Sequence, residues 1–110
     1  MSDDSLIKAC ANGDDLAQKR LFNQLSPQMY GVCLRYAIDE HQAMDMLQDG
    51  FVKVFQGLDS YGFSGSFEGW VRRIIVNTCL DALRKEKKHR NQQEIDDDLL
   101  SEGADEEITT

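Results

Sequence analysis

Apolar residues recur three and four positions apart through most of the first ninety residues, and no stretch alternates convincingly between apolar and polar side chains. Such spacing gathers apolar groups on one side of an α-helix. Only one proline is present to interrupt the helices. The sequence therefore predicts an all-α fold, a compact bundle of about four helices within residues 1–90.

The first half of this region divides into two helices. A short helix is expected before Gly13, because glycine often follows the last turn of a helix. A second helix begins near Asp14 and meets Pro27. Proline lacks a backbone N–H and its ring crowds the preceding turn, so a kink or a break is expected there.

The second half contains two more helices and a loop. Asp39 is a good N-cap for a third helix that ends near Gly57, and Ser66 is one for a fourth helix that fades near Arg90. The segment between them, Asp59 to Gly65, has the glycine and serine content of a loop. It nevertheless carries two large aromatic residues, which are unusual on an exposed loop and suggest a function.

Charge is separated into blocks along the chain. Residues 1–71 contain five basic and ten acidic residues. Residues 72–90 contain seven basic and two acidic residues, and residues 91–110 contain eight acidic residues and no basic one. Because salt screens charges beyond about 10 Å, the basic block can bind phosphates although the whole chain is acidic. Residues 91–110 are predicted to be a disordered acidic tail or linker that follows the domain of residues 1–90.

Several classes of protein are disfavoured. No apolar run is long enough for a membrane span, and the acidic N-terminus is unlike a secretion signal, so a cytoplasmic protein without membrane insertion is expected. Three separated cysteines and two histidines support neither a disulfide framework nor a metal site, and the cysteines are expected to be buried. Without a phosphate-binding loop or a paired nucleophile and base, neither an enzyme nor a cofactor is predicted.

The third helix carries an acidic patch. Asp45, Gln48 and Asp49 share the side opposite the apolar residues, because positions three and four apart lie together on a helix. Such a patch suits an arginine-rich partner. A merely solvated helix surface is the alternative, and on this segment alone it is favoured.

The loop aromatics are candidates for binding unpaired bases. Tyr61 and Phe63 lie among small residues, including Ser64 and Ser66, which leave room for a flipped base. Stacking of a base on an aromatic ring contributes about 1–3 kcal/mol. The alternative is that the rings fold back into the core, which is expected for Phe67 and is left open for Tyr61 and Phe63.

The fourth helix carries a cationic stripe. On a helical wheel Arg73, Asn77, Arg84 and Lys88 fall within about 60° of one another. The cations can neutralise phosphates, and the amide of Asn77 can both donate to and accept from a base edge. A solvated basic surface is the alternative.

The order of these segments is more specific than any one of them. An acidic helix with Asp-x-x-Gln-Asp-x-Phe precedes the glycine- and serine-rich aromatic loop, and Ser-Phe-x-x-Trp-x-x-Arg-Ile-x-x-Asn and Asp-x-Leu-Arg-Lys follow. From Asp14 to Arg90 the chain resembles region 2 of the extracytoplasmic-function (ECF) sigma factors.

This resemblance implies the fold, the partners and the roles of matching residues. Asp45, Gln48 and Asp49 would engage the clamp helices of the beta-prime subunit of core RNA polymerase. The loop from Tyr61 to Ser66 would cradle a base flipped out of the non-template strand of the minus-ten promoter element. Arg73, Asn77 and the basic end of the helix would hold that strand and the adjoining duplex, Trp70 would pack at the base of the loop, and an anti-sigma factor is a plausible regulator.

The chain departs from the family pattern at a few positions. The family's Phe-x-Gly opening of the loop is replaced by Tyr61-Gly62-Phe63, so the ring that would line the base pocket is left open. Gly50 interrupts the third helix, at a cost of about 1 kcal/mol relative to alanine, and Met44 replaces an acidic residue. Family members continue into a helix-turn-helix domain, so the chain is expected to be a fragment that starts transcription poorly.

Two other hypotheses remain. A helical adaptor would use its acidic and basic surfaces to bind proteins without any nucleic acid, and its binding would survive replacement of Asn77 or Tyr61. An anti-sigma-like regulator ranks third, because such a regulator would not be expected to carry the loop-and-helix pattern from Tyr61 to Lys85.

Overall fold

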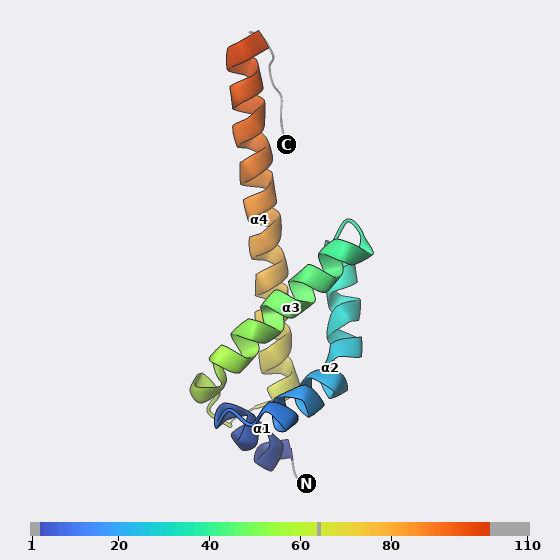
Figure 1. Cartoon of the computed structure of the whole chain (residues 1–110), viewed down its shortest axis with the longest axis vertical. Helices are drawn as coiled ribbons and strands as arrows, with labels where there is room; N and C mark the ends of the chain where they lie inside the picture. The colour runs from blue at the N-terminus through green and yellow to red at the C-terminus, as the bar shows by residue number, and fades with distance from the viewer. Residues whose placement is uncertain (1–2, 64, 102–110) are drawn as a thin grey trace. The chain divides into compact units, whose positions relative to one another are not determined.

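The computed structural model describes residues 3–63 and 65–101, with side chains described from residue 4 to residue 89 apart from residue 64. The elements are α1 (Asp3–Ala11), α2 (Asp15–Tyr36), α3 (Glu40–Gln56), the short 3-10 helix η1 (Leu58–Ser60) and α4 (Phe67–Ser101) (Figure 1). The described residues contain helices and no strand. The predicted all-α bundle of about four helices is therefore confirmed.

The helix starts predicted from capping residues are correct. The side chains of Asp14, Asp39 and Ser66 each accept a hydrogen bond from the backbone N–H three residues ahead, with donor–acceptor distances of 3.1, 2.8 and 3.0 Å. Each bond satisfies one of the amide groups left without a partner at a helix start. The starts of α2, α3 and α4 are consequently set by local sequence.

Pro27 lies inside α2 and does not end it. Figure 1 shows the ribbon of α2 bending between its blue first half and its cyan second half, so the predicted kink or break is present as a bend. Buried residues lie on both sides of the proline, Leu21 before it and Met29 after it. Packing of both halves against the core maintains the helix despite the hydrogen bond that proline cannot donate.

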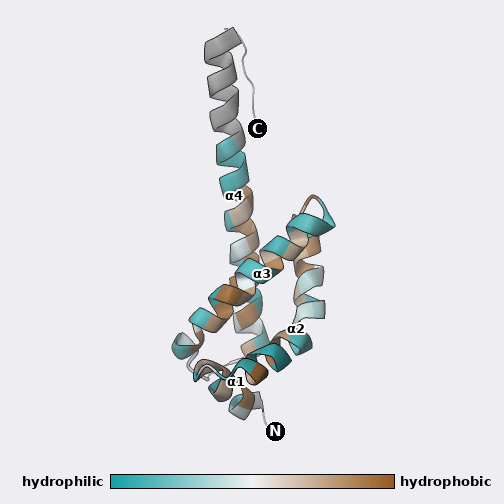
Figure 2. Ribbon diagram, in the orientation of Figure 1, coloured by the Kyte–Doolittle hydropathy of each residue, from teal (hydrophilic) through white to brown (hydrophobic). Residues whose placement is uncertain are grey.

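The chain divides into two units, Met1–Leu80 and Asp81–Thr110. The core of the first unit takes side chains from every element in it. Figure 2 shows apolar residues distributed along α1, α2 and α3. The largest fully buried side chains are Ile7, Cys10, Met29, Cys33, Met46, Val54, Val71, Ile75 and Cys79.

Close contacts join α4 to α3 and to α2. A Cβ atom on Gly50 of α3 would lie 2.5 Å from Cδ1 of Ile75, so the absence of a side chain lets the two helices approach. Gly50, which departs from the family pattern, thus offsets its poor helix propensity by allowing this packing. The sulfur atoms of Cys33 and Cys79 are 3.7 Å apart in the core, and all three cysteines are free and buried, as predicted.

The end of α4 differs from the sequence prediction. The helix continues to Ser101, whereas the sequence predicted that it fades near Arg90. Residues beyond Arg90 include Gln, Glu and Leu, which are strong helix formers, and the next glycine is Gly103. The intrinsic helix propensity of these residues accounts for the continuation of α4 past Arg90. The tail beyond Ser101 lies outside the described residues, and the division into a domain of residues 1–90 and a linker stays a prediction.

Candidate nucleic-acid interface

The acidic patch lies on the outer side of α3. Asp45, Gln48 and Asp49 are exposed, while Met46 and Leu47 between them are buried. The imidazole Nε2 of His41 lies 3.7 Å from a carboxylate oxygen of Asp45, at a position where both side chains are exposed. The structure therefore brings the three predicted residues together on one accessible side of the helix.

Exposed apolar residues on the same side of α3 were missed from the sequence. Met44 is 41% exposed and Val52 is 53% exposed, and both are one helical turn from Gln48. The spacing of four residues was the available signal. We call Met44, Asp45, Gln48, Asp49 and Val52 the α3 surface. The α3 surface thus combines charged and amide groups with two exposed apolar side chains.

Tyr61 anchors the loop from Asp59 to Ser66, which we call the recognition loop. Its side chain is 7% exposed, and its hydroxyl donates a hydrogen bond to the carbonyl oxygen of Gly65 at 3.1 Å. Its ring centroid lies 5.1 Å from that of Phe63, 5.0 Å from that of Phe67 and 5.3 Å from that of Trp70. Tyr61 therefore closes the loop from the inside.

Phe63 turns outward two residues later. Its side chain is 42% exposed and its φ is 59°, in the left-handed region that costs a non-glycine residue about 1–2 kcal/mol. Gly65 has a φ of 79°, which glycine adopts without that cost. The Nζ of Lys8, on α1, lies 5.6 Å from the centroid of the Phe63 ring. Strain of this kind persists only where the surrounding structure enforces it, and it gathers at functional sites.

The end of the recognition loop is fixed by the start of α4. The hydroxyl oxygen of Ser66 accepts the N–H of Gly69 and so caps the helix, while the hydroxyl can still donate a hydrogen bond. Trp70 is half-buried and stacks on Phe67 with ring centroids 5.7 Å apart, in agreement with its expected packing role. Ser64, also predicted to contact DNA, lies outside the described residues.

A pocket of about 250 Å³ opens where α1, α2 and the start of α4 meet. Sequence analysis missed it, because its walls come from three segments far apart in the chain. Its polar groups are contributed by Gln24, Ser66 and Glu68, while its apolar walls are Leu6, Ile7, Leu21, Leu25 and Phe67.

The predicted cationic stripe divides between the two units. In the first unit Arg73 and Asn77 are exposed, one turn apart on α4, and neither side chain forms a hydrogen bond or ion pair with the residues that the structure describes. In the second unit Lys88 is exposed, and a guanidinium nitrogen of Arg84 lies 2.6 Å from a carboxylate oxygen of Asp81. Arg84 therefore has a local partner, which weakens its availability for a phosphate.

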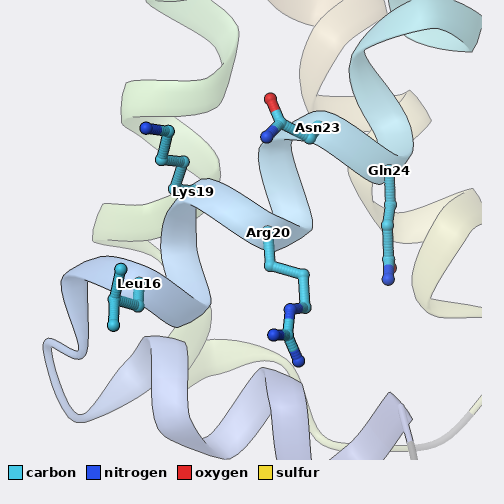
Figure 3. A pocket seen from close by; sticks show the side chains of 5 residues that line it. All are labelled: Leu16, Lys19, Arg20, Asn23 and Gln24. Atoms are coloured by element: carbon cyan, nitrogen blue, oxygen red, sulfur yellow. The ribbon is translucent and has the colours of Figure 1, made fainter.

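A shallow open hollow on α2 is a further polar surface. Figure 3 shows the residues that line it, with the side chain of Arg20 extending toward α1. Leu16 there is 79% exposed, and the polar groups come from Lys19, Arg20, Asn23 and Gln24. Nothing in the sequence marked this segment, because its residues face away from the core at ordinary helical spacing.

The comparison with protein families identifies the family of the chain. The family described as Sigma-70 region 2 matches residues 21–89. The chain belongs to the Sigma-70 region 2 family. Its match covers α3, the recognition loop and most of the basic part of α4. Together with the ECF relatives described next, it confirms the resemblance of these segments to an ECF sigma factor region 2 domain.

Similar proteins agree with this assignment. ECF RNA polymerase sigma factor SigM of Mycobacterium tuberculosis is 33% identical over 88 residues, which are 80% of this chain and 45% of the relative. SigW of Bacillus subtilis is 30% identical over 81 residues, 74% of this chain and 43% of the relative. The chain therefore spans about half the length of the curated relatives it matches.

A solved structure has the same region 2 fold. It is the NMR structure of an engineered region 2 of sigmaE in complex with GTAAAA, with a TM-score of 0.75 and 26% identity. The match covers 81% of this chain and 93% of that one.

Two further observations concern the described residues alone. No group of three or more His, Cys, Asp or Glu side chains there could hold a metal ion. None of the helices in this part of the region 2 domain combines the length and apolar character needed to cross a membrane.

Proposed function

We propose that this region 2 domain acts in transcription initiation in the bacterial cytoplasm, as a non-enzymatic factor that binds core RNA polymerase and the minus-ten promoter element. The observation that carries the proposal is the outward Phe63 ring on a loop closed from inside by Tyr61. A fold shared with a region 2 that is in complex with GTAAAA supports it.

The single-stranded non-template strand is the proposed ligand of the recognition loop. An exposed aromatic ring can stack on an unpaired base of any sequence, whereas Asn77 can distinguish bases by hydrogen bonding. Arg73 supplies a cation one turn from Asn77 for a neighbouring phosphate. In this arrangement Phe63 contacts the base and Tyr61 positions the loop.

A flipped base is the finer part of the proposal. The pocket beside Phe67 is small, and Gln24, Ser66 and Glu68 give it groups that can hydrogen-bond to the edge of a base. A fluorescent base analogue whose emission rises on unstacking, placed in turn at each position of the oligonucleotide, tests this point. A rise at one position supports flipping, and equal emission at every position contradicts it.

Core RNA polymerase is the proposed partner of the α3 surface. Asp45, Gln48 and Asp49 would contact cationic residues of the beta-prime clamp helices, and Met44 and Val52 would bury apolar area beside them. We also propose an anti-sigma factor, which the resemblance implies, as a regulator of the domain.

Fluorescence anisotropy with labelled single-stranded oligonucleotides tests the DNA part. The probes are a strand containing GTAAAA and variants with one base changed, measured across a salt series with wild type, Asn77→Ala and Arg73→Ala. We expect a base preference that weakens in Asn77→Ala and a shallower salt dependence in Arg73→Ala. If wild type binds neither alone nor with core polymerase, the protein-only adaptor hypothesis replaces this one.

A further inference from the structure

Lys8 lies beside the recognition loop although it is far from it in sequence. Its Nζ is 5.6 Å from the centroid of the Phe63 ring, a cation–π distance. It precedes residues 21–89, which match the family, and it also precedes the segment that carries the sequence resemblance. Its position beside the loop therefore follows from the fold and not from the sequence motifs.

The placement of Lys8 is determined by the packing of α1. Leu6, Ile7 and Cys10 of α1 are buried, and the side-chain amide of Gln18 donates a hydrogen bond to the carbonyl of Cys10 at 3.0 Å. α1 also contacts η1, whose last two residues are the first two of the recognition loop. The packing of the inner side of α1 thus holds Lys8 at the exposed side of the loop.

The charge of Lys8 is available for a ligand. The side chain is exposed, and within the described parts of the chain it forms no ion pair. Its ammonium group lies over the ring of Phe63. An exposed cation–π contact is worth less than the stacking of a base on the same ring, so a base can displace the ammonium group from the ring.

We infer that Lys8 is a DNA-binding residue of the recognition loop, and the inference rests on the proposed function. In the free protein its ammonium group covers the ring of Phe63. When a base stacks on Phe63, the ammonium group moves to a phosphate that flanks the stacked nucleotide. A flexible four-carbon stem allows this exchange without movement of α1. Lys8 thus adds affinity for the strand that depends on salt and not on base identity.

Anisotropy titrations of the whole chain with the GTAAAA strand across a salt series provide the test. We expect Lys8→Gln to bind about threefold to tenfold more weakly at low salt and to reduce the slope of log affinity against log salt by about 0.7, the value for one phosphate contact on a single strand. Lys8→Arg should restore the slope. Lys19→Gln, which removes an exposed lysine from the hollow on α2, is the matched control and should leave the slope unchanged.

A modified strand makes the test specific for a phosphate. An uncharged methylphosphonate is placed at each linkage in turn, and at one linkage wild type and Lys8→Gln should bind with equal affinity. If wild type binds the strand and Phe63→Ala weakens it, but Lys8→Gln keeps the wild-type slope, the role of Lys8 is overturned while the proposed function stands. Failure of wild type to bind the strand overturns both.

Discussion

The α3 surface and the recognition loop present function-bearing side chains in different ways. On α3 the backbone is a regular helix whose inner side is buried at Ala43, Leu47 and Val54, so the outer residues contribute little to the fold. In the recognition loop a single buried ring, Tyr61, maintains the backbone that exposes Phe63. Substitutions on the α3 surface should therefore affect binding alone, whereas substitutions in the loop can affect stability, binding or both.

Tyr61→Ala is expected to have the largest effect. It removes a buried ring that contacts three others, and should lower the free energy of unfolding by about 3 kcal/mol. Urea denaturation measures this change. Tyr61→Phe is the matched control, which loses the hydrogen bond to Gly65 and should cost about 1 kcal/mol. A Tyr61→Ala variant as stable as wild type would show that the loop does not depend on this ring.

Gly50→Val is the corresponding change on the inner side of α3. The added side chain would collide with Ile75, and we expect a loss of about 2 kcal/mol in unfolding free energy. Its outward neighbour Asp49 is the control, because Asp49→Ala should change stability by less than about 0.5 kcal/mol. Equal stability of the two variants in urea would contradict the close approach of α3 and α4.

Phe63→Ala separates binding from stability within the loop. Loss of the stacking surface should weaken binding to the GTAAAA strand by about 1.5 kcal/mol in anisotropy titrations. The unfolding free energy should change far less than in Tyr61→Ala, because the ring is 42% exposed. If both variants lose the same stability and the same affinity, the two aromatics do not have different roles.

Alkaline pH is expected to have the smallest effect on the free energy of unfolding. It acts through a cysteine in the core that supports both regions. Burial, followed by the nearby Cys79, raises the pKa of Cys33 to about 12. The unfolded thiol releases its proton near pH 9, whereas the folded one retains it, so raising the pH between these values favours unfolding. We expect a loss of about 1 kcal/mol by pH 9.5 in urea denaturation, and a smaller loss in Cys33→Ala. An identical pH dependence of the two proteins would contradict this.

The polar residues of the α3 surface could be predicted from the sequence, whereas the arrangement of the recognition loop could not. Helical periodicity was sufficient to place Asp45, Gln48 and Asp49 on the outer side of α3. The capping preference of Asp was sufficient to place the helix starts at Asp14 and Asp39, because both signals are local. The burial of Tyr61 could not be predicted, since it depends on Phe67 and Trp70 arriving from the next helix.

Close packing and contacts between distant segments were likewise beyond the sequence. From the sequence alone Gly50 only weakens the third helix, because its close approach to Ile75 is a contact between distant segments. Lys8 belongs to no motif, and its proposed role depends on its contact with a ring more than fifty residues away. The predicted position of the end of α4 was wrong, because after Arg90 the acidic composition and the helix propensity point to different structures.

Backbone amide NMR spectra of the whole chain, recorded during titration with the GTAAAA strand, test the central claim most directly. We predict shifts at Phe63, Arg73 and Asn77, with the amides of Asp45 and Asp49 unchanged, and the reverse pattern with a peptide of the beta-prime clamp helices. Shifts from the DNA strand on α3 and none in the recognition loop would contradict the account.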